Sequence, residues 1–462
     1  MFKISSTISA RSTKSENPFN RGNAEGRRKA LMKKMLPASA TLFWILVIPP
    51  FVRSEPAAPA TVVLTLEKAE ALALGESPAV SAATEREKAA HRRVLPAYLP
   101  NDPMVMVERS GEPNGPFHWN GATMEMLMAE EQIRFPGKSL VEASRLRAEA
   151  RKATSDSDNT RRNSLLQARE GYWDFYYRSK VAAILSETES QWKTLSTLFK
   201  SRDLTGQWAS VKAVRTQVEL ARAMNERLTA SKALRVSQAN LDHLFNASAG
   251  AQYVLGDPPP AGPLTVTREE ALRRALGENP EISSAVAMND AVKAMKRSAA
   301  LEHLPDFTVR AYGNREVGSP GFSDYGMRVG VTLPIFFPFK QTQASREASA
   351  LSAASAADLT DAKGLVAHEV EEAYVEAESA WELLKSYEDA DLAAQLKRAW
   401  EASRVAYRNE QMPASELIES YNMYLETLSE IYRARADYGK ALARLDFAMG
   451  TVADKGENHE KE

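Results

Sequence analysis

The residue types that usually perform catalysis are scattered along this chain of 462 residues. Six histidines are present, and none has a metal-ligand spacing such as that of an HExxH motif. The adjacent acids Glu130-Glu131 and Glu371-Glu372 resemble catalytic carboxylate pairs, but neighbouring residues on a helix do not face each other, so solvated faces are the simpler interpretation. Cysteine is absent, which excludes thiol nucleophiles, Cys-ligated zinc, disulfides and a lipidated N-terminal cysteine. The sequence therefore predicts neither an enzyme nor a bound cofactor.

A stripe of methionines is the one set of side chains that suggests metal chemistry. Met124, Met126 and Met128 are separated by single residues, which is the period of one face of a β-strand. Thioether sulfur prefers Cu(I), so a soft-metal site is one interpretation of the stripe. The other interpretation is an apolar strand face turned toward lipid, and we favour it. No metal site is therefore predicted.

The composition indicates a folded protein without a nucleic-acid partner. Hydrophobic residues make up 44% of the chain, which is too many for a disordered protein of this length. Lys and Arg number 59 and Asp and Glu number 60, so the formal net charge is only −1. Strongly basic composition, the usual mark of nucleic-acid binding, is missing.

The first sixty residues resemble a targeting segment. They contain ten Lys or Arg and three Asp or Glu. A basic cluster at 27–34 precedes an apolar stretch at 36–52 that prolines interrupt, and Ala58-Pro59-Ala60 matches an A-x-A cleavage pattern. We predict a signal segment over 1–60 rather than a single membrane anchor, with translation starting at Met1 or Met32. The mature chain is expected to be exported and to contain no transmembrane helix.

An internal repeat organises the rest of the sequence. The segment from Thr65 to Pro78 returns 202 residues later from Thr267 to Pro280, and each copy should begin with a helix capped by its threonine. The sequence predicts a first repeat over 61–255, a Pro-rich linker over 256–264, a second repeat over 265–450 and a polar tail over 451–462. The linker is expected to be stiff and exposed.

Each repeat should contain a long helical hairpin, about 138–246 and about 340–449. The stretch from Lys138 to Thr205 has no proline and one glycine, and the stretch from Lys340 to Met412 has the same pattern. From Leu417 to Met449, apolar residues recur with alternating spacings of four and three, interrupted by Arg435. This spacing is typical of antiparallel helices in coiled-coil packing.

Each repeat should also contain a β-hairpin, about 103–133 and about 305–335. Large apolar residues alternate with small or polar ones from Tyr325 to Leu333, over about the length that crosses a bilayer in a tilted strand. Val329 and Val331 should then face lipid, and Arg328 should face the barrel lumen. Four strands are too few to close a barrel, so several chains would have to build it together.

These features resemble those of the TolC-like outer membrane efflux family, over nearly all of Thr65 to Gly450. The duplicated Thr-x-Glu-x-Ala…Pro starts, the Leu-Pro pair before each hairpin, the long helices and the Leu-Asp ends near Leu241 and Leu445 carry the resemblance. It implies a mainly α-helical fold with a β-barrel part. The resemblance implies that this part is a homotrimeric, twelve-stranded barrel in the outer membrane lipid of a Gram-negative bacterium. It also implies a periplasmic helical tunnel that docks to an adaptor protein and an inner-membrane RND-type transporter.

The resemblance also implies candidate site residues at the periplasmic tip. The turns between long helices fall near 203–208 and 409–413, and the second has Glu410 where the family has glycine. The acidic constriction pair of the family corresponds to Glu416 and Glu419, while Ser210 stands at the equivalent position of the first copy. Tyr407 and Arg408 are candidates for closing the tip.

Several alternatives stay open for the cargo and the class of protein. The segments 99–104 and 135–138 look most like the heavy-metal branch of the family. A protein-secreting outer membrane channel of type I systems would have the same architecture. A periplasmic adaptor normally has a single helical hairpin with many short strands, and a structural coiled-coil protein would lack the alternating strands. The sequence therefore favours a passive efflux duct and does not name the substrate.

Overall fold

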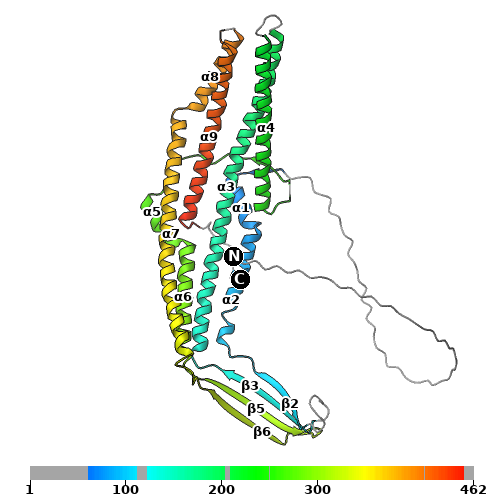
Figure 1. Ribbon diagram of the computed structural model, residues 1–462, viewed down its shortest axis with the longest axis vertical. Helices are drawn as coiled ribbons and strands as arrows, with labels where there is room; N and C mark the ends of the chain where they lie inside the picture. The colour runs from blue at the N-terminus through cyan, green and yellow to red at the C-terminus, as the bar shows by residue number, and fades with distance from the viewer. Residues whose placement is uncertain (1–60, 112–121, 203–208, 249, 410, 452–462) are drawn as a thin grey trace, which may run out of the picture. The chain divides into compact units, whose positions relative to one another are not determined.

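The two halves of the chain contain similar elements in the same order (Figure 1). The computed structural model describes residues 61–111, 122–202, 209–248, 250–409 and 411–451. They belong to the second of two units into which contacts divide the chain, Ala57–Glu462. The predicted signal segment and nearly all of the predicted polar tail lie outside the described residues.

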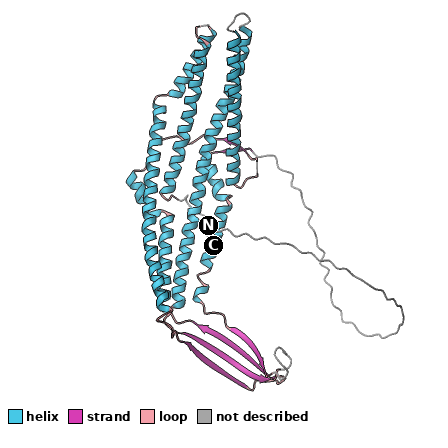
Figure 2. Ribbon diagram, in the orientation of Figure 1, coloured by secondary structure: helices cyan, strands magenta, loops and turns pink. Residues whose placement is uncertain are grey.

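Helices dominate both halves, which confirms the expected mainly helical fold (Figure 2). The first half contains β1 Thr61–Leu64, α1 Leu66–Gly75, α2 Pro78–Arg92, a 3-10 turn Pro96–Tyr98, β2 Met104–Ser110, β3 Met124–Ile133, α3 Lys138–Arg202, α4 Ala209–Leu244 and β4 Gln252–Leu255. The second half contains α5 Arg268–Glu278, α6 Pro280–Leu301, β5 Asp306–Glu316, β6 Asp324–Thr332, α7 Gln341–Asp389, α8 Leu392–Arg408 and α9 Ala414–Ala448.

The two β-hairpins form a single antiparallel sheet in the order β2-β3-β5-β6. The hairpins join through β3 and β5, whose register runs from Met124 opposite Glu316 to Ile133 opposite Phe307. Among the described residues, β2 pairs only with β3 and β6 pairs only with β5. The sheet therefore has two open edges, one from each repeat.

The helices lie side by side with α3 in the middle (Figure 1). Near the sheet, α3 contacts α2 on one side and α6 on the other, and α6 contacts α7. Farther from the sheet, α3 contacts α4 on the same side as α2, and it contacts α9 on the same side as α6. The edge helices are thus α2 and α4 on one side and α7 and α8 on the other.

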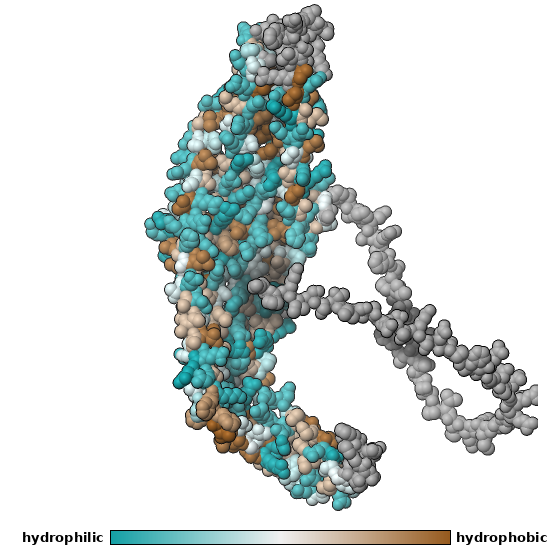
Figure 3. Space-filling view, viewed as in Figure 1, coloured by the Kyte–Doolittle hydropathy of each residue, from teal (hydrophilic) through white to brown (hydrophobic). Residues whose placement is uncertain are grey.

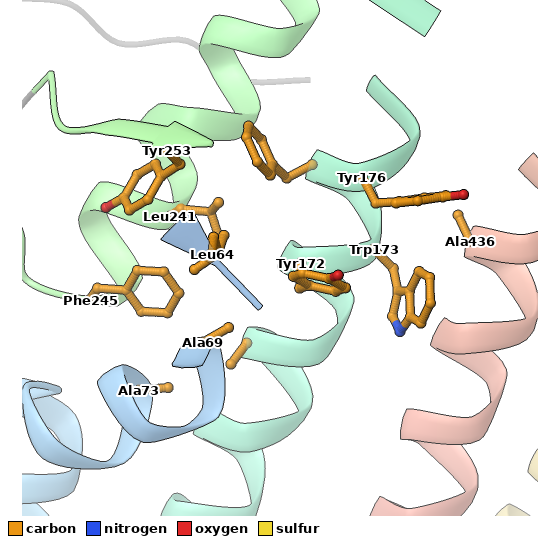
Figure 4. Close-up of a cluster of buried hydrophobic side chains, with 12 residues drawn as sticks. Leu64, Ala69, Ala73, Tyr172, Trp173, Tyr176, Leu241, Phe245, Tyr253 and Ala436 are labelled. Atoms are coloured by element: carbon orange, nitrogen blue, oxygen red, sulfur yellow. The ribbon is translucent and has the colours of Figure 1, made fainter. Parts of the chain in front are cut away.

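A core around the short helix α1 holds the middle of the bundle together (Figure 4). Thr65 caps α1 by accepting a hydrogen bond from the Lys68 backbone N–H at 3.2 Å, and Thr267 caps α5 in the same way. The parallel pair of β1 and β4 brings the two ends of the first repeat together. Four aromatic side chains of α3 fill the space between the strand pair, helix α1 and helix α9. They are Tyr172, Trp173, Phe175 and Tyr176.

The apolar seam predicted for α9 is buried or half-buried along its length, from Leu417 to Met449. Its one charged member, Arg435, donates a hydrogen bond to the carbonyl of Pro259 at 2.9 Å. Tyr438 donates its hydroxyl proton to the carbonyl of Gly262. The Pro-rich linker therefore contacts α9 through its backbone, while Pro259 and Pro260 are exposed as expected.

The two long helical stretches differ in one respect that the sequence did not predict. Helix α3 continues unbroken for 65 residues, whereas its counterpart breaks between α7 and α8. Asp391 lies at the break with φ of 44°, in the left-handed region. Aspartate is one of the few residues other than glycine that tolerates this conformation, because its short polar side chain can bond locally.

Replacing Gly439 of α9 by alanine is expected to destabilise the fold. An added Cβ would lie 2.0 Å from Cε2 of Trp173, whose indole is 5% exposed and surrounded by other rings. Such overpacking costs about 1–3 kcal/mol, more than the helix propensity that alanine contributes. Gly439→Ala should lower the melting temperature of the purified protein. Gly364→Ala in α7, where nothing lies within 4 Å of the added Cβ, should preserve or raise it.

Candidate functional site

The four-stranded sheet has one polar face and one apolar face. Residues directly opposite each other in neighbouring strands point to the same side, so the register assigns every side chain to a face. The polar face carries Met104, Met106, Glu108, Met124, Met126, Met128, Glu130, Thr308, Arg310, Tyr312 and Arg328. The apolar face carries Val105, Val107, Leu127, Ala129, Ile133, Phe307, Val309, Ala311, Met327, Val329 and Val331. Its charged residues are the half-buried Glu131, opposite Val309, and Arg109, Glu125 and Arg315 near one end of the strands.

Arg328 and the two valines of β6 lie on opposite faces, as the alternation predicted. Val329 and Val331 are 63% and 50% exposed on the apolar face. The Arg328 guanidinium lies 5.0 Å from the ring centroid of Tyr312 on the polar face, where cation–π attraction favours it. On the same face, Arg310 donates from Nε to Glu130 at 2.8 Å. The polar face thus holds solvated and paired charges.

The expected position of the methionine stripe is wrong. Met128 stands opposite Met106 of β2 and opposite Tyr312 of β5, so the stripe shares the face of Arg328 rather than the face of Val329. The alternation in β3 was ambiguous because both faces of this strand carry apolar side chains. Only pairing with β5 and β6, whose faces are clearly different, decides which side is which.

A charged cluster on the apolar face was not found from the sequence. Glu125 is 9% exposed and accepts hydrogen bonds from Arg109 Nη2 at 3.0 Å and from Arg315 Nε at 2.6 Å. The three residues stand opposite one another in register, near the ends of β2, β3 and β5 that are farthest from the helices. The sequence did not predict the cluster because its members are far apart in the chain: Arg315 is 190 residues from Glu125.

An exposed aromatic loop follows β6 where the sheet meets the helices, and it is apolar in the space-filling view (Figure 3). Its large exposed side chains are Leu333, Ile335, Phe336, Phe337 and Phe339. Phe339 is 80% exposed, so the loop is not part of the core of this chain. Exposed apolar surface of this kind marks contact with lipid or with another protein.

Lys138 connects the two repeats at the same junction. Its ammonium lies 3.0 Å from Oδ1 of Asp306 and donates to the carbonyl of Leu304 at 3.1 Å, and its side chain is 7% exposed. Oδ1 of Asp306 also accepts a hydrogen bond from the Phe135 backbone N–H at 2.8 Å. The segment 135–138, interpreted as a mark of the heavy-metal branch, thus has a structural function in this chain.

At the opposite end of the bundle, a small aromatic core holds the tip helices together. Trp192 of α3, Trp400 of α8 and Tyr421 of α9 are all buried, and the rings of Trp400 and Tyr421 are 4.4 Å apart between centroids. Burial raises the pKa of Tyr421 to about 12. Ser403 and Ser420 add a hydrogen bond of 3.0 Å between α8 and α9. The tip of the second hairpin is thus packed as a unit.

Charged side chains also tie the tip of the first hairpin. Glu189 of α3 is buried, and it pairs with Lys193 at 2.6 Å and with Arg227 of α4. The hydrogen bond from Lys193 is the main reason that the pKa of Glu189 is lowered. The carboxylate therefore stays ionised at neutral pH and links α3 to α4.

The predicted constriction residues lie on the exposed side of this tip. Glu416 and Glu419 are both exposed at the start of α9, while Leu417 and Ile418 between them are buried against the aromatic core. Tyr407 is half-buried and packs against the same core, so it contributes to the packing of the tip. Arg408 ends α8, and its side chain, Glu410 and the turn 203–208 lie outside the described residues.

Clusters of metal-ligating side chains and membrane-spanning helices are both absent from the described residues. No group of three or more His, Cys, Asp or Glu side chains in this part of the chain could hold a metal ion. None of the helices within the described ranges is both long enough and apolar enough to cross a membrane. The features that remain for function are the two-faced sheet, its open edges and the helical tip.

Comparison with known proteins confirms the resemblance to TolC-like outer membrane efflux proteins. The family model described as "Outer membrane efflux protein" matches residues 271–451. This family and the structures similar to this chain are channels, not enzymes. A comparison with curated protein sequences gives no match.

Solved outer membrane channels share the fold over most of their length. The CmeC channel of Campylobacter jejuni has a TM-score of 0.68 at 14% identity, covering 83% of this chain and 85% of CmeC. VceC of Vibrio cholerae has a TM-score of 0.67 at 15% identity, covering 83% of this chain and 96% of VceC. The open MtrE channel of Neisseria gonorrhoeae has a TM-score of 0.68 at 13% identity, covering 84% of this chain and 89% of MtrE. At these identities the likeness concerns the fold.

Lys138→Met should destabilise the junction between sheet and helices. The methionine keeps the aliphatic stem but leaves Asp306 without its charged partner, which should cost about 1–3 kcal/mol given that Asp306 is partly exposed. The equivalent residue of the second repeat, Lys340, is exposed and provides a matched control. In chemical denaturation, the midpoint of Lys138→Met should be lower than that of the unaltered protein, and the midpoint of Lys340→Met should be unchanged. Equal midpoints for both variants would contradict a structural function of Lys138.

Proposed function

We propose that this chain is one protomer of a trimeric outer membrane duct, the exit channel of a tripartite efflux system. The single observation that carries the proposal is the two-faced sheet with both edges open. A membrane barrel needs an apolar outer face, a polar lumen and strands that are all paired, because lipid offers no hydrogen-bond partners. The sheet meets the first two requirements, and pairing with further copies of the chain would meet the third.

The open edges favour head-to-tail assembly. Strand β2 at one edge and strand β6 at the other belong to different repeats, so β6 of one protomer can pair with β2 of the next. Such heterologous contacts form a ring when the rotation closes. Three protomers would give twelve strands and a polar lumen wide enough for solutes.

The helices support the same direction of assembly. Helix α4 lies on the β2 side and keeps large apolar side chains exposed, as does α7 on the β6 side. The exposed residues are Val214, Val218, Met224, Leu228 and Val236 on α4, and Leu351, Leu365, Val375 and Leu383 on α7. Contact of α2 and α4 of one protomer with α7 and α8 of the next would bury both sets and would close a helical tunnel below the barrel.

The membrane position follows from the exposed apolar surfaces. The valine-rich face would contact outer membrane lipid, and the aromatic loop 333–339 would lie at the periplasmic boundary, where membrane barrels carry aromatic girdles. Helices α3, α4, α7, α8 and α9 would then extend into the periplasm. The sheet provides the membrane-spanning segment, and no spanning helix is required.

The tip would form the gate and the docking end. Threefold symmetry would turn Glu416 and Glu419 into rings of carboxylates that favour cations in a narrow pore. Tyr407 and Arg408 would hold the tip closed. The periplasmic partner is expected to be an adaptor protein, and the energy source an inner-membrane RND-type transporter. Heavy-metal ions are one proposed cargo. The alternative is protein export by a type I system, and a passive duct would serve either cargo equally.

Substitutions on the two faces of β6 should separate lipid contact from lumen contact. Arginine at position 329 should cost about 2–4 kcal/mol if Val329 faces the bilayer midplane, whereas Arg328→Ala should leave assembly intact. The fraction of detergent-stable trimer in isolated outer membranes measures the difference. Equal tolerance of Val329→Arg and Arg328→Ala, or recovery of a soluble monomer, would argue against the barrel.

The double variant Glu416→Ala with Glu419→Ala should change the gate without changing assembly. Removing both carboxylate rings should lower the cation selectivity of purified trimers in planar bilayers and weaken block by multivalent cations from the periplasmic side. Glu378→Ala in α7 removes an exposed carboxylate away from the tip and should change neither property. Unchanged selectivity and block in the double variant would show that these residues do not line the constriction.

A further inference from the structure

Five methionines gather on the polar face of two neighbouring strands. Strand β2 contributes two and strand β3 contributes three, and the set consists of Met104, Met106, Met124, Met126 and Met128. The apolar side chains of these strands are divided by type between the two faces. On the polar face, every apolar side chain of β2 and β3 is a methionine. On the apolar face these strands carry no methionine, and their apolar side chains are Val105, Val107, Leu127, Ala129 and Ile133. Ordinary hydrophobic packing does not require this division, because a lipid-facing surface accepts methionine as readily as valine or leucine.

The register places the thioethers within reach of one another. Met106 and Met128 are directly opposite, and directly opposed Cβ atoms are about 4.5–5.5 Å apart. Met104 is diagonal to Met128, and Met126 is diagonal to Met106, at about 7–8 Å. Methionine has three rotatable side-chain bonds, so the sulfur atoms can converge on a single point. Two of them can therefore share one ion, and either diagonal neighbour can supply a third sulfur.

The surroundings admit a cation. Met104 and Met106 are 51% and 40% exposed, so their sulfur atoms are reachable from solvent, while Met128 is 5% exposed and anchors the group. Glu108 stands opposite Met126, and its exposed carboxylate adds negative charge on the same face. Glu130, opposite Met104, is already bonded to Arg310. The strands β2 and β3 contain no histidine, so thioethers are the only soft ligands that they offer.

We propose that Met106 and Met128, completed by Met104 or Met126, bind a soft monovalent cation, Cu(I) or its analogue Ag(I). Neutral thioether ligands select soft ions, whereas Zn(II) and Mg(II) prefer nitrogen or oxygen ligands. Exposed sulfur atoms on a strand face form a shallow site, which suits an ion that binds and leaves again. The inference rests on the proposed function, because the polar face lines a conducting path only in the assembled barrel, and it narrows the cargo to soft cations.

Silver binding to the purified full-length trimer tests the site. Chloride-free AgNO3 is titrated against the protein in detergent, and bound silver is measured after equilibrium dialysis. The variant Met106→Leu with Met128→Leu keeps size and hydrophobicity, and its affinity for Ag(I) should fall at least tenfold. Met327→Leu changes an exposed methionine on the apolar face and should bind like the unaltered protein. Zn(II) should not displace the bound silver.

X-ray absorption spectroscopy of the silver-loaded protein gives a readout independent of affinity. The first coordination shell should contain sulfur, and the sulfur contribution should be lost in the double leucine variant. If that variant does not assemble, Met104→Leu with Met126→Leu removes the completing ligands instead and should also weaken binding. The proposal is overturned if the unaltered protein binds no Ag(I), if an assembled leucine variant binds as tightly, or if the first shell lacks sulfur.

The conductance of potassium by the same trimers separates this inference from the proposed duct. Leucine and unaltered trimers should conduct potassium equally, because the substitutions leave the lumen charge unchanged. Loss of silver binding with intact conductance in the variants identifies the site within a working duct. Absence of conductance in the unaltered protein would contradict the duct itself, whatever the silver titration shows.

Discussion

The pairing of β3 with β5 is the constraint on which the rest of the structure depends. It is the only strand ladder between the two repeats in the described residues, and it spans ten residue pairs from Met124–Glu316 to Ile133–Phe307. Because side chains alternate along a strand, a shift of one residue would move every side chain of one hairpin to the other face. Lys138 and Asp306, close to the end of this ladder, connect the same two repeats through an ion pair. The register therefore decides which residues contact lipid and which line the lumen of the proposed duct.

The sequence predicted the features that depend on local pattern. Proline-free stretches predicted the long helices, Thr65 and Thr267 predicted the helix caps, and the apolar spacing from Leu417 to Met449 predicted the buried seam of α9. In β6 the alternation of valine with arginine and glycine separated the two faces correctly. Each of these signals is contained within one helix or one strand, so no information about distant contacts was needed.

Features that depend on contacts between distant segments could not be predicted. The face of the methionine stripe depends on pairing with β5, and the Glu125 cluster joins strands from both repeats. The parallel pair of β1 and β4 links segments about 190 residues apart, with only four residues in each strand. At the tip, the sequence and the family resemblance predicted Glu416 and Glu419 as a pair on one side of α9. The direction of that side relative to a lumen depends on neighbouring protomers.

The break at Asp391 makes the two hairpins mechanically unequal. An unbroken helix resists bending along its whole length because every turn is fastened by backbone hydrogen bonds, whereas an interruption concentrates bending at one point. A load applied at the tip would therefore be carried along α3 without interruption. In the second hairpin, α8 and the part of α9 that is packed on it would move together, and α8 would bend relative to α7 at Asp391. In a ring of identical protomers, hairpins with the continuous helix α3 would alternate with hairpins that are interrupted between α7 and α8. Movement of the proposed gate would then belong to the jointed half of each chain, with the other half serving as a fixed frame.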